Sequence, residues 1–273
     1  MNFSAYAAQP DDALNLLEGA LLIAADARPG LDRSAVERQL EELAAPLREL
    51  GVAGLPPRAQ ARALGDQLFV RAGFRGNTSD YYDPKNSFLD EVLARRIGIP
   101  ITLAIVYLEV AGRAGVFASP VGFPGHFLVC LDIHAERLAV DPFAAGSVLD
   151  ERDLAALLRR SGSQLSYAPE LIAATPVRQV LARMLMNLRG IYAQRGELSR
   201  LLVVFDRLID LLPNAAEERR DRGLLFGRLG APDAALADLE RYLELAPQAP
   251  DAPQVQQWLL QMQKASKGGT VRS

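Results

Sequence analysis

The stretch GIPITLAIVYLEVAGRAGVFASPVGFPGHFLVCLDI, residues 98–133, decides the fold class of this chain. A break at Gly98-Ile99-Pro100 precedes an apolar run that begins near Ile101 and ends around Gly112 to Gly115. Because apolar residues would lie nearly all round a helix formed by this run, we predict a buried central helix. The residues that follow are grouped in short β-branched and aromatic runs, which are typical of strands.

The predicted sheet is small and antiparallel. Its strands are Phe117 to Phe123, His126 to Ile133 and Leu138 to Phe143, separated by Pro124-Gly125 and by His134-Ala135-Glu136. A helix from about Asp150 to Arg160 follows. Helical periodicity also predicts three helices before the sheet: from Asp11-Asp12 to Pro29, at about residues 34–50 and at about residues 58–72. A fourth helix is expected to begin at a cap, Asn86 or Ser87, and to reach Arg96. This order indicates an α+β fold, with a helical N-terminal part and the central helix packed on the sheet.

The last third of the chain repeats itself with a period of thirty-four residues. Counting forward by that period pairs Tyr192 with Phe226, Gly196 with Gly230, Leu201 with Ala235, Phe205 with Leu239, Leu208 with Tyr242, and Pro213 with Pro247. The period and the residue types resemble the tetratricopeptide repeat, a pair of antiparallel helices. Gly223 stands where this repeat prefers a small residue, but the first copy has Arg189 there. Residues 251–264 would form a capping helix.

Three segments follow from these patterns. We expect an α+β domain at residues 1–168, an all-α tetratricopeptide-like part with its capping helix at residues 175–265, and a disordered tail at residues 266–273.

The composition argues against several classes of protein. The 30 basic and 33 acidic residues give a net charge of −3, so we expect no nucleic-acid binding by bulk electrostatics. The single cysteine, Cys130, cannot form an internal disulfide, and neither a secretory signal nor a membrane-length apolar run is present, so we expect a cytoplasmic protein without a membrane partner. With two histidines and one cysteine, we expect no metal site, and no phosphate-binding loop predicts a cofactor.

The predicted sheet contains the best candidates for chemistry. His126 begins one predicted strand and Asp141 lies in the next, so the imidazole and the carboxylate can hydrogen-bond across neighbouring strands. Such a carboxylate fixes the tautomer of the ring and raises its basicity. Simpler interpretations stay open: His126 can satisfy a local backbone group, and Asp141, which precedes a proline, can form a turn. A nucleophile would come from the start of the central helix, where free N–H groups stabilise negative charge.

Three segments in combination resemble the SirB family: YYDPKNSF at Tyr81 to Phe88, RRIGIPITL at Arg95 to Leu103, and GFPGHF at Gly122 to Phe127. The resemblance covers about residues 11–265. It implies a divergent branch of the transglutaminase-like (papain-like) superfamily, often followed by tetratricopeptide-like repeats. The superfamily pattern has a cysteine at the start of the central helix, a histidine on the next strand and an aspartate on the one after. By this resemblance, His126 matches the histidine and Asp141 the aspartate.

The expected nucleophile is missing from this chain. The matching helix start, Pro100-Ile101-Thr102, contains no cysteine, and Thr102 is the nearest nucleophilic residue type. A threonine hydroxyl is a far poorer nucleophile than a thiolate unless a base activates it, and Thr102 is most simply a helix cap. Cys130 cannot replace the thiol, because four residues of strand separate it from His126 by about 13 Å. We predict that Cys130 is a small buried hydrophobic residue.

A groove beside His126 would be lined by Tyr81, Tyr82, Asn86, Arg96 and Phe127. The loop from Tyr81 to Asn86 is equally well explained as a packed loop. Arg95 and Arg96 suit a solvated helix end, or one of them binds the carboxylate of a ligand.

Three functions remain open. The missing cysteine and the repeats favour a non-catalytic protein that binds peptides or partner proteins through the groove and the helical repeats, and the SirB resemblance implies a regulatory role. The alternative is a hydrolase or acyl-transferase acting on an amide or peptide bond. In that enzyme His126 is the base, Asp141 orients it, and Thr102 or water attacks. A third is a structural or regulatory adaptor whose own side chains fill the groove. The sequence leaves the oligomeric state open.

Overall fold

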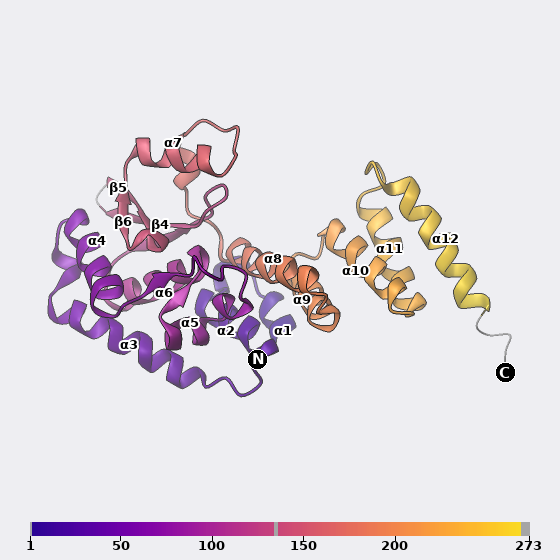
Figure 1. Cartoon of the computed structure of the whole chain (residues 1–273), viewed down its shortest axis with the longest axis horizontal. Helices are drawn as coiled ribbons and strands as arrows, with labels where there is room; N and C mark the ends of the chain where they lie inside the picture. Colours follow the sequence, from indigo (N-terminus) through magenta and orange to yellow (C-terminus); the bar gives the residue numbers. More distant parts are fainter. Residues whose placement is uncertain (1, 134–135, 269–273) are drawn as a thin grey trace. The chain divides into compact units, whose positions relative to one another are not determined.

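Residues 98–133 fold as predicted, into a buried helix followed by strands. The computed structural model describes residues 2–133 and 136–268. Helix α6 (Pro100–Arg113) packs against helices and strands of its own unit (Figure 1), and ten of its 14 residues are buried. Because water reaches so little of its surface, an apolar pattern all round the helix is what this position requires.

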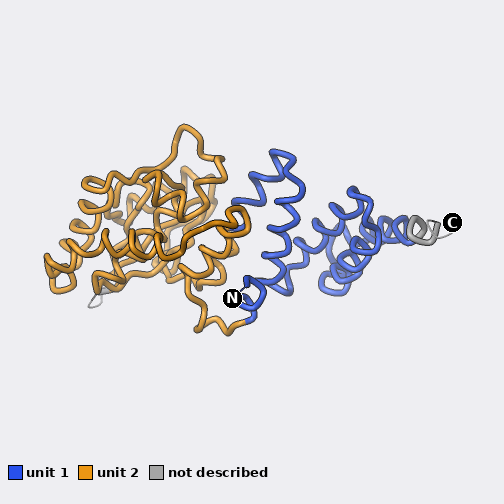
Figure 2. The backbone as a smooth tube through the Cα atoms, turned by 90° about the horizontal axis from the view of Figure 1, so that it is seen from below, with its two compact units in different colours: residues 1–8, 185–273 blue, residues 9–184 orange. Residues whose placement is uncertain are grey.

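The chain divides into two compact units, which Figure 2 shows in different colours. One unit comprises residues 9–184, and the other comprises residues 1–8 and 185–273. We call them the α+β unit and the repeat unit and describe each by itself.

Helices of the α+β unit pack around α6. They are α2 (Leu16–Ala27), α3 (Arg33–Glu49), α4 (Pro57–Gly65), which continues as a π-helical turn at Asp66–Arg71, and α5 (Leu89–Arg95). Side-chain caps explain where two of them begin. The Asn15 side chain accepts from the Glu18 amide at 2.9 Å, and the Asp32 side chain accepts from the Ala35 amide at 3.1 Å.

The sheet has four antiparallel strands in sequential order: β3 (Ala118–Val121), β4 (Leu128–Ile133), β5 (Glu136–Asp141) and β6 (Ser147–Leu149). Helix α7 (Glu151–Arg160), capped by Asp150, contributes Leu154 and Leu158 to one buried hydrophobic cluster with Leu128 and Cys130 of β4. Helix α6 also contacts β3 and β4 (Figure 1). Residues Leu128 to Leu131 are therefore all buried. Burial on both faces explains why β4 is continuously apolar instead of alternating.

The sheet differs from the prediction at two places. β6 was not predicted. The strand expected from His126 begins at Leu128, and His126 lies in the bend before it. The predicted separator between the second and third strands includes residues 134–135, which lie outside the described part of the chain.

The predicted cap of the fourth helix is wrong. α5 begins after Phe88, and neither Asn86 nor Ser87 caps it, because both belong to a 3-10 turn at Pro84–Ser87. The side chain of Asn86 is used elsewhere, as described below. α5 ends at Arg95, because the next residue, Arg96, has a left-handed φ of 58°.

In the repeat unit, the helices follow the thirty-four-residue period. They are α1 (Phe3–Ala7), the end of α8 (Val177–Arg195), α9 (Leu198–Leu211), α10 (Ala216–Arg228), α11 (Pro232–Leu245) and α12 (Ala252–Gly268). α9 and α11 begin and end thirty-four residues apart. Gly196 and Gly230, which the period pairs, both have left-handed φ angles, 68° and 75°, so each ends a helix in a conformation that favours glycine.

Packing explains why the two copies of the repeat differ at one position, where the first has Arg189 and the second has Gly223. A Cβ at Gly223 would lie 3.0 Å from Leu239, so α10 and α11 pack too closely there for a side chain. At the equivalent position, Arg189 instead donates to Glu218 at 3.2 Å and to Asp221 at 3.1 Å.

The segment boundaries expected from sequence stay predictions. The compact units divide after residue 184, inside α8, and residues 1–8 pack with the repeat unit, where the Ser4 hydroxyl donates to Asp210 of α9 at 2.6 Å. α12 reaches Gly268 and so includes residues 266–268 of the expected tail, while residues 269–273 lie outside the described part. Of the helices described, none is both long and apolar enough to cross a membrane.

Candidate functional site

His126 and Asp141 are in hydrogen-bond contact. The imidazole Nε2 lies 2.9 Å from Asp141 Oδ2, and the two side chains are only 13% and 8% exposed. The β4–β5 pairing explains the contact: Val129 is opposite Val140, so the residue after Val140 and the bend before Leu128 lie at the same end of the two strands. The predicted pair is therefore present in the fold.

Asp141 also shapes the backbone around it. Its second carboxylate oxygen, Oδ1, accepts from the amides of Phe143 at 2.9 Å and Ala144 at 3.2 Å, and so caps the 3-10 turn Pro142–Ala144. The Asp141 carboxylate therefore has both roles that the sequence suggested, because it forms the turn and is the partner of His126. Three hydrogen bonds hold it in one orientation, which in turn fixes the ring of His126.

The geometry assigns a chemical role to each ring nitrogen of His126. A carboxylate on Nε2 favours the tautomer with its proton there, which leaves the lone pair on Nδ1. Among the described residues Nδ1 has no hydrogen-bond partner. The ring can therefore accept a proton, or a hydrogen bond from a ligand, at Nδ1.

Thr102 does not join this pair. Its hydroxyl donates to the Asn86 carbonyl at 2.8 Å and accepts from the Ile99 amide at 3.1 Å, and the residue is fully buried. The hydroxyl thus satisfies the free amide at the start of α6 and ties this helix to the turn at Pro84–Ser87. Neither bond leaves it free to attack a substrate.

Aromatic rings adjoin the His126–Asp141 pair. The ring of Phe143 lies 6.1 Å from the His126 ring and 6.3 Å from the Tyr81 ring, and Tyr81 lies 5.4 Å from Tyr82. Tyr81 and Tyr82 are 41% and 62% exposed, so they offer aromatic surface to a ligand. Sequence reasoning missed Phe143, although its place two residues after Asp141 is a signal that could have identified it.

Two glycines make this arrangement possible. A Cβ at Gly76 would lie 2.4 Å from the Phe143 ring, so only glycine leaves room for it. Gly125, directly before His126, has a φ of 69° and would place a Cβ 2.3 Å from Ser161. Any other residue at position 125 would strain the bend that positions His126.

Arg183 of α8 lies over the ring of Phe127 and interacts with Tyr81. Its guanidinium is 5.5 Å from the Phe127 ring centre and donates to the Phe123 carbonyl at 3.1 Å. Burial lowers the pKa of this guanidinium and raises the pKa of the Tyr81 phenol, and the two groups interact electrostatically. Sequence reasoning missed Arg183, because nothing local connects it to residues some sixty positions earlier.

Asn86 supports the tyrosine loop from inside the protein. It is fully buried, and its amide nitrogen donates to the carbonyls of Asp80 at 2.8 Å and Tyr81 at 3.2 Å. Its side-chain oxygen accepts from Asn77 at 3.1 Å and Arg95 at 2.8 Å. Asn86 therefore positions Tyr81 and Tyr82, and its side chain does not face a groove.

The other two predicted groove residues have different surroundings. Phe127 is 1% exposed and serves as the surface on which Arg183 stacks. The guanidinium of Arg96 lies 4.7 Å from the Phe74 ring centre and interacts electrostatically with Glu42. Of the five residues, Tyr81 and Tyr82 are the ones whose side chains are well exposed.

Cys130 is buried within β4, as predicted. Burial, with a smaller contribution from Asp132, raises the pKa of its thiol to about 11. A thiol with so high a pKa is almost entirely protonated at neutral pH and is a poor nucleophile.

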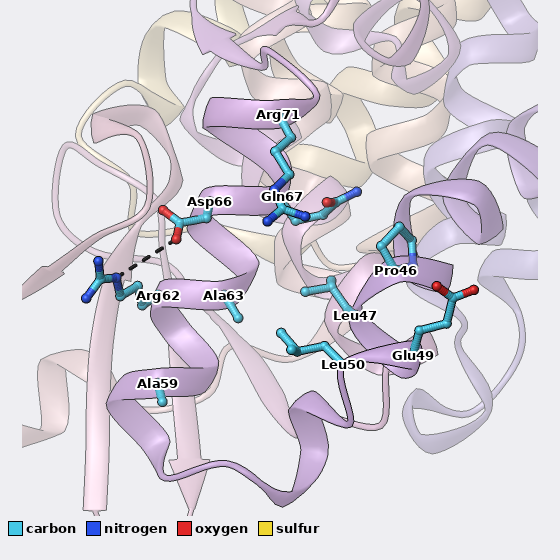
Figure 3. A pocket seen from close by; sticks show the side chains of 10 residues that line it. All are labelled: Pro46, Leu47, Glu49, Leu50, Ala59, Arg62, Ala63, Asp66, Gln67 and Arg71. Carbon is cyan, nitrogen blue, oxygen red and sulfur yellow. Dashed lines mark ion pairs between the residues drawn. The ribbon is translucent and has the colours of Figure 1, made fainter.

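A separate hollow of about 510 Å³ lies between the end of α3 and α4 with its π-helical turn (Figure 3). Its charged residues include Arg62 and Asp66, which pair with each other at 3.9 Å and are well exposed. Gln67 donates to the Leu43 carbonyl at 3.2 Å. The hollow lacks a constrained acid–base pair, so the His126 region is the better candidate for function.

Comparison with known proteins agrees with this architecture. The transglutaminase-like superfamily matches residues 34–186, which include His126 and Asp141, and the tetratricopeptide repeat matches residues 188–259. A UPF0162 protein of Xylella fastidiosa is 39% identical over 242 residues, 87% of this chain and 86% of the relative. A UPF0162 protein of Vibrio cholerae is 29% identical over 250 residues, 88% and 90% of the two chains.

A eukaryotic protein also matches. F-box only protein 21 of Mus musculus is 31% identical over 228 residues, which are 71% of this chain but 35% of that protein. These two bacterial relatives match over 86% and 90% of their length, and so this chain, which carries a tetratricopeptide repeat region, belongs to the transglutaminase-like superfamily and to the UPF0162 (SirB-like) family.

Proposed function

We propose that this protein binds a peptide segment of a partner protein beside the His126–Asp141 pair and does not cleave it. The observation that carries the proposal is the use of the Thr102 hydroxyl, which donates to the Asn86 carbonyl at 2.8 Å. A base with its orienting carboxylate but no adjacent nucleophile can bind an amide, yet it lacks the atom that would form an acyl intermediate.

The surroundings of the pair suit an extended peptide. Nδ1 of His126 accepts a hydrogen bond from a peptide N–H, and the exposed rings of Tyr81 and Tyr82 provide apolar contact area with polar tips. Tetratricopeptide repeats are protein-binding modules, and the matched repeats at residues 188–259 supply a further surface for a partner protein. Binding without turnover suits a regulatory role in the cytoplasm.

A second function has one observation in its favour. The His126–Asp141 pair is formed at 2.9 Å and Nδ1 has no described partner, so the ring is able to take a proton from a water molecule. In that case the protein would be an amide hydrolase in which water, not Thr102, attacks.

One experiment separates the two functions. The purified chain is titrated with a mixture of random-sequence hexapeptides while the imidazole signals are followed by NMR. The chain contains two histidines, so the His126 signal is assigned by comparison with the variant His126→Gln. The same samples are incubated overnight and analysed by mass spectrometry.

We expect the His126 signal to shift on titration and the peptides to stay intact. Cleavage by the wild-type chain that is absent with His126→Gln would establish the hydrolase instead. An unmoved His126 signal at millimolar peptide would show that this pair does not bind peptides.

A further inference from the structure

The guanidinium of Arg183 has donors that the described residues do not use. A guanidinium carries five N–H groups, and the hydrogen bond to the Phe123 carbonyl uses one of them. Among the described residues Arg183 makes no ion pair with a carboxylate. Arg95 of the same unit shows the contrast, since it pairs with Asp83 at 2.8 Å and also donates to Asn86 at 2.8 Å.

The position of this charge connects it to the His126 site. The Arg183 guanidinium lies 5.5 Å from the ring centre of Phe127, the residue after His126, and interacts electrostatically with Tyr81. The ring centres of His126 and Phe143 are 6.1 Å apart, and those of Phe143 and Tyr81 are 6.3 Å apart. The Tyr81 ring therefore lies within about 12 Å of the His126 ring. An extended peptide advances about 3.3 Å per residue, so at most about four residues bridge this distance.

A carboxylate is the ligand group that such an arginine fits best. The rigid fork of the guanidinium matches the two oxygens of a carboxylate, and the phenol of Tyr81 is a further donor. Partial burial strengthens the attraction, because no carboxylate among the described residues pairs with Arg183 and a partly buried charge is less screened by water.

Resting on the proposed function, we infer that Arg183 and Tyr81 form a carboxylate-binding subsite beside the His126–Asp141 pair. The bound peptide therefore carries a carboxylate within about four residues of the segment held at His126. This carboxylate belongs either to the C-terminus of the peptide or to an aspartate or glutamate side chain.

Four matched peptide mixtures test the inference and distinguish the sources. All are random-sequence hexapeptides of neutral residues. The first has a free C-terminal carboxylate, the second is amidated, the third is amidated with one glutamate, and the fourth is amidated with glutamine in its place. Affinity is read from the His126 ring signal and from the Nε–Hε signal of Arg183.

If the C-terminal carboxylate is recognised, wild-type protein should bind the free-carboxylate mixture about tenfold more tightly than the amidated one. If a side-chain carboxylate is recognised, it should bind the glutamate mixture about tenfold more tightly than the glutamine one. In either case the gain comes from a charge-assisted hydrogen bond. Arg183→Gln should abolish this difference while the His126 signal still responds. Arg62→Gln, which removes the same charge at a residue whose side chain is 85% exposed, should leave the difference unchanged.

Equal binding of all four mixtures, with a shifting His126 signal, would overturn the carboxylate subsite and leave the proposed function standing. A His126 signal that no mixture moves would overturn the proposed function itself. If Arg183→Gln lowers the melting temperature, the variant Arg183→Lys takes its place in the test, because lysine keeps the positive charge but lacks the two-pronged guanidinium. Arg183→Lys should retain part of the preference for the carboxylate-bearing peptides. A full preference in that variant would exclude bidentate recognition.

Discussion

Single side chains in this site combine structural and chemical roles. Asp141 caps a turn through one oxygen and holds His126 through the other. Thr102 is the candidate nucleophile from sequence, but its hydroxyl joins the start of α6 to the Asn86 carbonyl. A helix start can lower the pKa of a thiol, but at the start of α6 the Thr102 hydroxyl satisfies backbone groups.

Replacing Thr102 tests this structural role. Thr102→Val keeps the shape but removes the hydroxyl from a fully buried position, which should lower the free energy of unfolding by about 2 kcal/mol. Thr102→Ser keeps the hydroxyl and should cost about 1 kcal/mol for the lost methyl group. Urea unfolding measures both, and peptide binding should be unchanged in both. If Thr102→Ser cleaved peptides and Thr102→Val did not, Thr102 would be the nucleophile after all.

Cys130 provides a second test at the residue scale. Burial raises the pKa of its thiol to about 11, whereas an unfolded cysteine has a pKa of about 8.5. At pH 8 the thiolate fraction should therefore be more than about a hundredfold lower in the folded chain, and alkylation by iodoacetamide should slow by at least this factor. Mass spectrometry follows the reaction without ambiguity, since the chain has one cysteine. Folded and urea-unfolded chains reacting within tenfold of each other would contradict the burial of Cys130.

At the scale of elements, the site depends on how loops pack between helices and strands. The loop before α5 is held by Asn86, and the turn after β5 places Phe143 against Gly76. Each of these loops contains only a short 3-10 turn, at Pro84–Ser87 and at Pro142–Ala144, so hydrogen bonds and close contacts, not helix or strand propensity, determine where Tyr81 and Phe143 lie.

Gly76→Ala should disturb the site through Phe143. The new methyl group would lie 2.4 Å from the Phe143 ring, so the ring must shift and its contacts with His126 and Tyr81 must change. We expect a loss of about 1–3 kcal/mol in unfolding free energy and a displaced His126 NMR signal in the absence of peptide.

A matched control lies in α6. Gly112 is exposed, and a Cβ added to it would meet no atom within 4 Å, so Gly112→Ala should stabilise the helix by about 0.5–1 kcal/mol and leave the His126 signal in place. An unshifted His126 signal in Gly76→Ala would show that Phe143 does not position the ring.

For the whole molecule, the division into two compact units predicts separate local stabilities. The first eight residues pack with the repeat unit, not with the α+β unit that follows them in sequence. Phe3 is 2% exposed, contacts Tyr6 at 6.1 Å between ring centres, and lies under the guanidinium of Arg207. The N-terminal segment therefore contributes to the stability of the repeats.

Phe3→Ala should destabilise the repeat unit by about 3 kcal/mol, because a buried aromatic ring is lost. Hydrogen exchange should accelerate in α9 and stay unchanged in α6. Leu260→Ala, at a residue that is 56% exposed, is the control and should change neither. If Phe3→Ala increased the hydrogen-exchange rate in α6 as much as in α9, the two units would unfold together.

The order of elements and the repeat period were predictable from sequence because they depend on local periodicity. The apolar run at Ile101 required burial whatever surrounded it, and Gly196 and Gly230 marked helix ends through their backbone freedom. The His126–Asp141 pair was also predictable, since neighbouring antiparallel strands bring their ends together at a register that the sequence nearly specifies.

The remaining features of the site were decided by tertiary packing. Arg183 lies some sixty residues from the loop whose carbonyl it binds, and no local pattern connects the two. The role of the Thr102 hydroxyl depends on the Asn86 carbonyl, and the side chain of Asn86 is directed inward by partners on three other segments. Sequence by itself determined which elements form, because local periodicity depends on neighbours in the chain. Only the tertiary structure decided which polar groups are already satisfied and which remain available to a ligand, because hydrogen-bond partners are chosen among groups that meet in space.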